Sequence, residues 1–244
     1  MSSLYRGSVA VALASVFFAA TARAELITLN VDSALSSLTL SGSAYGLSFA
    51  EQAPGSLTAQ YAGTITGDLS GGVFTFSGGS AINALATGPY SNAPNTIGPE
   101  MGNYGVVASG TLPPPYSGFG PQVISGVYKN IILDLTAGTA TNGAATTATF
   151  NFNSAHLDYG ANPSGLTGDS SMVGDNAANA SASNVTWNGT TLTIPVSFTI
   201  TGDNRIQTFT GTIVAAVPEP SSFGLLSLVG VVGFFRNRSR NRIS

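Results

Sequence analysis

Strict alternation of apolar and polar residues is the feature that most limits the folds open to this chain. In the stretch LTIPVSFTI, residues 192–200, five apolar side chains alternate with Thr, Pro and Ser. A period of two places one set on the core side of a strand and the other set toward water. Turn residues flank the stretch at Asn188-Gly189 and Gly202-Asp203, and Pro195 indicates an edge strand or a bulge. The stretch therefore predicts a β-strand.

The same alternation recurs between residues 25 and 216, where no apolar period of 3.6 residues indicates an amphipathic helix. Further strands are expected at residues 26–31, 44–49, 57–65, 73–76, 123–135, 146–152 and 206–214. About nine or ten strands with turn residues between them predict an all-β fold, with an antiparallel β-sandwich or jelly-roll-like body. A β-solenoid is the alternative, but the chain shows no fixed repeat period, which weakens that interpretation.

Charge is distributed unevenly along the chain. Residues 25–217 contain ten acidic side chains and only two basic ones, Lys129 and Arg205, which gives this segment a net charge of −8. Proteins that bind nucleic acids need a basic surface against the phosphates, so this composition excludes nucleic acid as a partner. The chain has no cysteine, so disulfides, thiolate metal sites and cysteine nucleophiles are excluded as well.

The first 24 residues have the layout of a secretory signal peptide. Arg6 supplies an early positive charge, an apolar run covers residues 9–20, and Ala22-Arg23-Ala24 provides the small residues of an A-x-A cleavage site. We expect an N-terminal signal helix that signal peptidase removes after Ala24, which leaves Glu25 as the first residue of the mature protein. Residues 25–216 then form one exported domain, long enough to bury a core.

The C-terminal segment, residues 217–244, has three parts. Val217-Pro218-Glu219-Pro220 comes first, and its two prolines favour an extended backbone. Residues 223–235 carry no charge and would span about 20 Å as a helix. A basic cluster follows at Arg236, Arg238, Arg240 and Arg242. Long arginine side chains extend a short span, and basic clusters stay on the cytoplasmic side. We therefore expect a transmembrane helix, stopped by the arginines, that anchors a precursor in the inner membrane.

This order of a Pro-Glu-Pro motif, an apolar stretch and a terminal arginine cluster resembles the PEP-CTERM sorting signal of exopolysaccharide-producing Gram-negative bacteria. The resemblance covers residues 217–242 and leaves the body unassigned. It implies that an exosortase, a membrane-embedded cysteine protease, processes the chain at or near Val217-Pro218-Glu219-Pro220. It also implies that the mature protein is delivered to the cell envelope, the cell surface or the extracellular matrix. The role that follows is structural or adhesive, associated with exopolysaccharide or biofilm.

We expect no enzymatic activity, and the alternative is a secreted carbohydrate-binding module or polysaccharide hydrolase. His156 and Asp158 would share the polar face of a strand, because residues i and i+2 point the same way. Gly168-Asp169-Ser170 is similar to the start of a hydrolase motif. That hydrolase family places its serine before its histidine in the chain, the reverse of the order here. We therefore predict no catalytic residues and a solvent-exposed His156.

Two segments without apolar periodicity, residues 86–105 and 159–184, are expected to be long surface loops, where binding sites often lie. The second segment offers Ca²⁺ oxygen ligands from Asp169 and Asp175, with Asn176 and Asn179 nearby. Their spacing matches neither an EF-hand nor a calcium-binding nonapeptide repeat. The expectation is therefore no cofactor and no metal, with Ca²⁺ at Asp169 and Asp175 as the weak candidate.

Aromatic side chains could bind glycans by stacking on sugar rings. Trp187 is the sole tryptophan and fits the inward set of a short strand with Val185, so we expect it in the core. The aromatic residues expected at the surface are Tyr90, Tyr104, Tyr116, Phe119 and Tyr159. The prolines at 113–115 would hold two of these, Tyr116 and Phe119, on a stiff turn.

Overall fold

The structure of the protein is a computed structural model, and it describes residues 24–91, 99–141, 148–173, 176–178, 185–202 and 204–218. Several predicted features lie outside these ranges: the signal helix with Ala22, the transmembrane helix, Glu219 and Pro220, the four C-terminal arginines, and Asp175. A search of the described residues finds no helix with the length and apolar character needed to cross a membrane.

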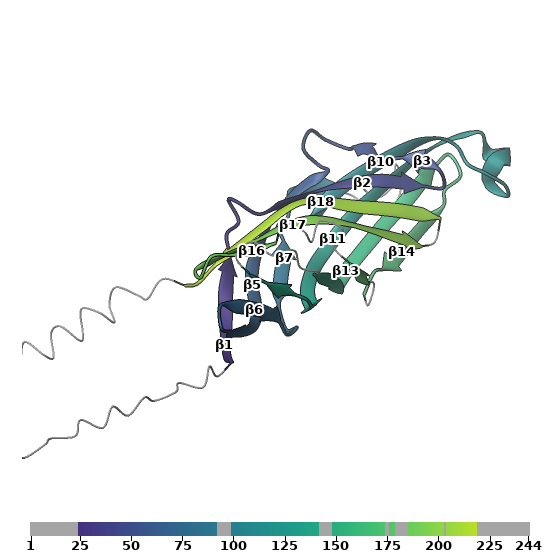
Figure 1. Ribbon diagram of the computed structural model, residues 1–244. Coiled ribbons are helices and arrows are strands. Elements are labelled where there is room, and N and C mark those ends of the chain that lie inside the picture. The colour runs from purple at the N-terminus through teal and green to yellow at the C-terminus, as the bar shows by residue number, and fades with distance from the viewer. Residues whose placement is uncertain are drawn as a thin grey trace, which may run out of the picture.

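The described chain is built from strands and short connections (Figure 1). The strands before residue 112 are β1 (Glu25–Val31), β2 (Ser37–Ala44), β3 (Leu47–Ser48), β4 (Ala50–Glu51), β5 (Thr58–Ser70), β6 (Val73–Phe76), β7 (Ala81–Ala84), β8 (Gly88–Tyr90), β9 (Glu100–Gly102) and β10 (Tyr104–Thr111). The later elements are the 3₁₀ helix η1 (Tyr116–Phe119), β11 (Pro121–Ala137), β12 (Thr139–Ala140), β13 (Thr149–Asn162), β14 (Thr167–Ser171), β15 (Asn176–Ala178), β16 (Thr186–Trp187), β17 (Thr191–Gly202) and β18 (Arg205–Ala216).

Sixteen strands belong to one sheet, whose main path runs β14-β13-β11-β7-β5-β1-β18-β17-β16. Every ladder between these strands is antiparallel, as the alternation predicted. β2 continues the line of β1, because each pairs with β18 on one side and β5 on the other. Ser36 covers the break between them, since its hydroxyl donates to the carbonyl of Val214 at 3.1 Å and accepts from its N–H at 2.9 Å.

The sheet rolls over until its two ends face each other across the larger of two hydrophobic clusters, and the smaller cluster contains Leu112, Ile124 and Ala161. Phe150 and Phe152 of β13 pack against Phe198 of β17 and Phe209 of β18, with ring centroids 5.2 to 6.1 Å apart. An isolated bridge between Thr141, which follows β12, and Thr186 of β16 links the end strand β16 to the β6–β12 pair. The all-β, antiparallel prediction is confirmed. The sandwich or jelly roll is not, because hydrogen bonding runs through one continuous sheet where two separate sheets were expected.

Several strand boundaries differ from the sequence-based ones. The hairpin of β17 and β18 is as predicted, and β16 pairs with β17 at Leu192 and Thr193. The strand expected at residues 44–49 is wrong, since Tyr45 and Gly46 form the turn between β2 and β3. The loop expected at 86–105 contains short strands, and the loop expected at 159–184 contains the end of β13 and all of β14.

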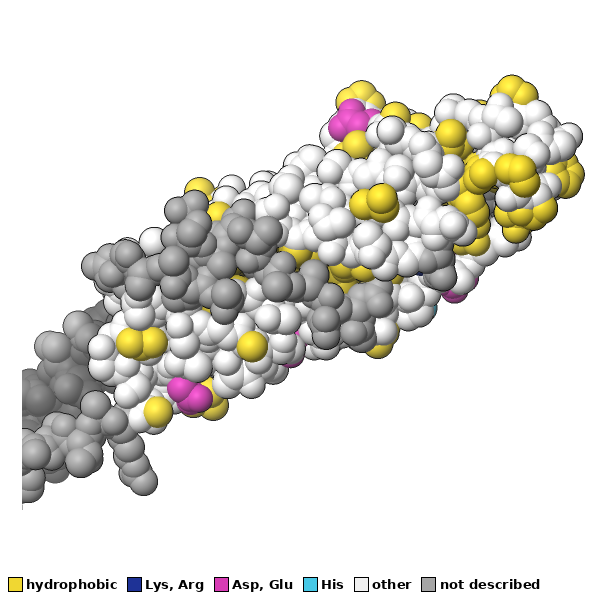
Figure 2. All heavy atoms as spheres, turned by 45° about the vertical axis from the view of Figure 1, so that its right-hand side comes forward, with side chains coloured by type: hydrophobic (Ala, Val, Ile, Leu, Met, Phe, Trp, Pro, Cys, Tyr) yellow, Lys and Arg dark blue, Asp and Glu magenta, His cyan; other side chains and the backbone are white. Residues whose placement is uncertain are grey.

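Glu25 and Pro218 lie at the same end of the elongated body, and the β10–η1–β11 connection lies at the opposite end (Figure 1). The pairing of Val31 with Ala215 holds the first and last strands together. Exposed apolar side chains gather at the opposite end, which we call the distal end (Figure 2). They include Phe119 and Val123.

Candidate functional site

The three residues considered for catalysis do not converge. The His156 Nδ1 atom lies 3.3 Å from Asp169 Oδ1, across the β13–β14 ladder. Asp158 instead binds Lys129, whose ammonium group also donates to Glu100 Oε2 at 2.8 Å. Ser170 accepts a hydrogen bond from Arg205. Each group is therefore directed to a different partner, and His156 lies on a partly exposed surface of β13.

Lys129 forms the main ion-pair cluster of the described residues. It stands on β11 between Glu100 of β9 and Asp158 of β13, and all three side chains are largely shielded from solvent. The hydrogen bond to Asp158 and then that to Glu100 raise the pKa of Lys129 above its ordinary value, against a smaller effect of burial. The cluster links three strands, and its two ion pairs engage Lys129, one of the two basic side chains of the body.

The weak calcium candidate gains no support from the geometry. The Asp169 side chain is 65% exposed and is paired with His156, and Asp175 is not described. Within the described ranges, no three His, Asp or Glu side chains come close enough together to hold a metal ion.

The aromatic residues divide differently from the prediction. Trp187 is buried as expected, and its ring centroid lies 5.5 Å from that of Phe74. Tyr104 and Tyr90 are also buried, so their prediction as exposed residues is wrong. Tyr104 belongs to β10, and its hydroxyl shares a 2.9 Å hydrogen bond with that of Tyr61 in the core. Of the five tyrosine and phenylalanine candidates, Phe119 is the most exposed, at 54%.

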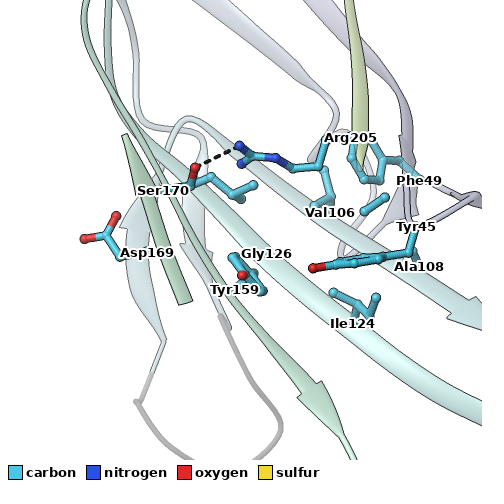
Figure 3. A pocket seen from close by; sticks show the side chains of 12 residues that line it. Tyr45, Phe49, Val106, Ala108, Ile124, Gly126, Tyr159, Asp169, Ser170 and Arg205 are labelled. Atoms are coloured by element: carbon cyan, nitrogen blue, oxygen red, sulfur yellow. Dashed lines mark hydrogen bonds between the residues drawn. The ribbon is translucent and has the colours of Figure 1, made fainter. Parts of the chain in front are cut away.

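A cavity of about 160 Å³ lies inside the distal half of the rolled sheet, and we call it the inner cavity (Figure 3). Its apolar wall comes mainly from the β3–β4 connection, β10, β11 and β13. The lining residues on this wall are Phe49, Val106, Ala108, Ile124 and Leu157. Gly126 of β11 also lines the cavity and adds no side chain to it.

Arg205 of β18 and Ser170 of β14 form part of the polar wall of the inner cavity, and Asp169, Tyr45 and Tyr159 line the cavity as well. Arg205 Nη2 donates to Ser170 Oγ at 2.8 Å, and Figure 3 shows both groups on the same side of the cavity. Behind them, the Tyr128 hydroxyl is buried, and burial raises its pKa far above the ordinary value, against an opposite effect of the nearby Arg205 charge. Arg205 is half-buried as a residue, and its Nε and Nη1 atoms are buried.

A second, wider hollow of about 580 Å³ adjoins the inner cavity, and we call it the outer hollow. Tyr45 and Arg205 line both spaces. Tyr45 adopts a left-handed backbone conformation, with φ of 52°, in the tight turn between β2 and β3. Its ring packs edge-on against Tyr116, with centroids 6.0 Å apart. The turn thus places an aromatic ring where the two spaces meet.

The outer surface of β17, β18, β2 and the start of β5 forms a second feature, which we call the hydroxyl face. Ser197, Thr210, Thr39 and Thr58 stand in one row across the four strands, and Thr199, Thr208 and Ser41 stand in the next row. Adjacent rows are about 6.6–6.8 Å apart and adjacent strands about 4.7–4.9 Å. The outward positions of β17, β18 and β2 are all described, and none carries a charge.

Sequence reasoning found neither feature. The cavity residues come from six separate strands and two connections between strands, so no local pattern joins them. One signal was available, because Arg205 is one of only two basic residues between residues 25 and 217. The hydroxyl face is visible only after the register is known, since its rows run across strands.

Comparison with known proteins identifies the tail and leaves the body without a relative. No curated protein and no solved structure matches the chain. Residues 216–240 match the family model of the PEP-CTERM protein-sorting motif, as the residues from Val217 onward indicated. The chain therefore carries a PEP-CTERM sorting motif immediately after β18, and this motif marks an exported protein that an exosortase processes.

Proposed function

We propose that the body is a non-enzymatic, structural or adhesive component of the cell envelope or extracellular matrix, associated with exopolysaccharide in a biofilm. In this proposal, signal peptidase cleaves after Ala24 and the inner membrane holds the precursor through its C-terminal segment. Exosortase then processes the chain near Val217-Pro218-Glu219-Pro220. The mature protein is delivered to the envelope, the surface or the medium.

The hydroxyl face is the observation that supports this role most directly. Thr39, Thr210 and Thr199 are exposed, and hydroxyl groups can both donate and accept hydrogen bonds. Repeated hydroxyls without charge suit a neutral polysaccharide chain, whose own hydroxyls form the same kind of bonds. Many weak contacts spaced along a polymer add up through effective concentration. Backbone and uncharged polar side chains also cover much of the surface seen in Figure 2.

The positions of the chain ends fit the same role. Because Glu25 and Pro218 lie together, both processing events would take place at one end of the body (Figure 1). The distal end and the long hydroxyl face then point away from the membrane that holds the precursor.

Adhesion can be tested by cosedimentation of the full-length chain with exopolysaccharide purified from the native host. Thr39→Val combined with Thr210→Val removes two neighbouring hydroxyls and keeps the side-chain shape. We expect weaker cosedimentation of this double variant. Thr167→Val, at an exposed position of β14, is the matched control and should bind like wild type. Equal binding by all three proteins would contradict the proposal that the hydroxyl face binds exopolysaccharide. No binding by wild type would contradict the matrix role.

Processing can be tested by intact mass of the protein recovered from membrane and medium fractions of the host. A species that begins at Glu25 and ends between Val217 and Pro220 is expected. A mass excess over that species would reveal a new anchor or glycan. A mature species that still contains residues 223–244 would show that the tail is a permanent anchor, and the proposed delivery would be wrong.

A further inference from the structure

We propose that the inner cavity binds a small monocarboxylate whose apolar part is about the size of a phenyl ring. This site is separate from the hydroxyl face, and the proposal does not depend on the matrix role. It follows from the size of the cavity, its apolar wall, the cation in its polar wall and its connection to the outer hollow.

The volume of the cavity sets the size of the ligand. The inner cavity measures about 160 Å³. An apolar protein cavity of about 150 Å³ stays dry when empty and takes up benzene. The space therefore suits a single six-membered ring or an aliphatic group of similar volume, and it is too small for a second ring.

Small residues line one side of this space, where the strands pack closely. A Cβ atom at Gly126 would lie 3.0 Å from Leu157 Cδ1 and 3.1 Å from Val106 Cγ2, so even a methyl group there would be tight. Ala108 is buried on the neighbouring strand β10 and also lines the cavity. Phe49 and Ile124 complete an apolar wall that would contact the ring of the ligand.

The polar wall selects the charge of the ligand. Arg205 presents a guanidinium group, whose fork of N–H donors matches a carboxylate. Ser170 Oγ accepts from Arg205, which leaves its own O–H available to donate toward the same carboxylate. Asp169 does not oppose this charge inside the cavity, because its carboxylate points away from it and toward His156 (Figure 3). An anionic group is therefore favoured over a neutral or cationic one.

The outer hollow lies against the polar side of the inner cavity. Tyr45 and Arg205 line both spaces, so the guanidinium group stands where the two spaces meet. The strongly acidic body repels polyanions, whereas a single carboxylate needs only one favourable local contact. The site thus suits a small monocarboxylate and not an acidic polysaccharide.

The test compares three ligands of one shape by isothermal titration calorimetry on the full-length chain in lipid nanodiscs, with empty nanodiscs as the blank. The ligands are phenylacetate, 2-phenylethanol and 2-phenylethylamine. One hydrogen bond to a charged group contributes about 1.5–3 kcal/mol. We therefore expect phenylacetate to bind at least about ten-fold more tightly than the alcohol, and the amine not to bind. Equal binding of acid and alcohol, or no binding of phenylacetate, would overturn the proposal.

Variants locate the binding. Ala108→Leu fills the inner cavity and should abolish phenylacetate binding while it keeps Arg205. Ser170→Ala removes one carboxylate donor and should weaken binding by about ten-fold or less. Val123→Ala changes an exposed residue of β11 outside the cavity and is the matched control. Arg205→Gln should abolish the preference for the acid. If that variant does not fold, the Ala108→Leu and Ser170→Ala variants test the proposal. Wild-type affinity for phenylacetate in Ala108→Leu would show that the ligand binds elsewhere.

Discussion

Replacement of Phe198 by alanine should strongly destabilise the whole body. Phe198 is 1% exposed and lies in the middle of the aromatic cluster that joins the two ends of the sheet. Its ring is stacked against Phe150 at 5.2 Å and against Phe209 at 5.1 Å, and it meets Phe152 edge-on at 6.1 Å. The substitution therefore removes contacts of β17 with both β13 and β18.

The size of the effect can be worked out from these contacts. A buried phenylalanine replaced by alanine costs about 3–5 kcal/mol. Each aromatic pair contributes about 0.5–1.5 kcal/mol beyond the burial of area, and Phe198 takes part in three such pairs. We therefore expect a loss near the upper limit, about 4–5 kcal/mol, from a total stability of about 5–15 kcal/mol for a domain.

Urea unfolding of the chain, followed by Trp187 fluorescence and by far-ultraviolet circular dichroism, measures this loss. Phe119→Ala is the matched control, because the same side chain is lost from an exposed site, and it should cost less than about 0.5 kcal/mol. A loss below about 1 kcal/mol for Phe198→Ala would refute the closely packed cluster. Two separate transitions by the two probes would refute the idea that the rolled sheet unfolds as one unit.

Three further predictions concern the backbone and the buried polar groups, each measured by urea unfolding. Burial raises the pKa of Tyr61 and Tyr104, so these tyrosines stay protonated in the folded state, and stability is full below about pH 10 and falls above it. Tyr61→Phe should cost about 1 kcal/mol at pH 7 and reduce the slope above pH 10, and an unchanged slope would contradict the assignment. Gly42 has φ of 149°, and an added Cβ would collide with the carbonyl oxygen of Ile206. Gly42→Ala should therefore cost about 3 kcal/mol or more, whereas Gly118→Ala, with open space around it, should cost less than about 0.5 kcal/mol. Asp134 accepts hydrogen bonds from the N–H groups of Gly79 at 3.1 Å and Ser80 at 2.7 Å. Asp134→Ala should cost about 2–4 kcal/mol because both donors lose a charged acceptor, and a loss below 1 kcal/mol would show that water replaces the carboxylate.

Local patterns were sufficient for the elements with one buried face. The alternation in residues 192–200 predicted β17 because every second side chain there packs into the core. The strands that sequence reasoning missed have other reasons to form. β10 buries one face at Tyr104, Val106 and Ala108, but Gly105 is also buried and Val107 is half-buried on the other face, so the segment shows no clear apolar–polar alternation. β14 consists of Thr, Gly, Asp and Ser, and its pairing with β13 places it in the sheet without any apolar pattern.

The closure of the sheet could not be predicted from local patterns, because alternation identifies the inward face of a strand but not the strand that it faces. Phe150 and Phe198 are both inward residues in a sandwich and in a rolled sheet alike. The difference lies in the ladders that connect them. β7 pairs with β11 on one side and with β5 on the other, and this link keeps one sheet continuous where a sandwich would divide it.

The tail could be predicted because its parts follow one another in the sequence: Pro-Glu-Pro, an apolar stretch and arginines.

The inner cavity combines three features that cost stability or add little to it. Ala108 leaves space in a region where a larger apolar residue would bury more area. Tyr45 holds a left-handed conformation, which costs about 1–3 kcal/mol for a residue other than glycine. Arg205 turns a guanidinium group inward in a body that has only one other basic side chain. Each feature lowers stability or adds nothing to it, and all three meet at one place in the distal half. Random packing defects would be scattered over the molecule. Their coincidence is the pattern expected where selection has retained a binding site at the expense of stability.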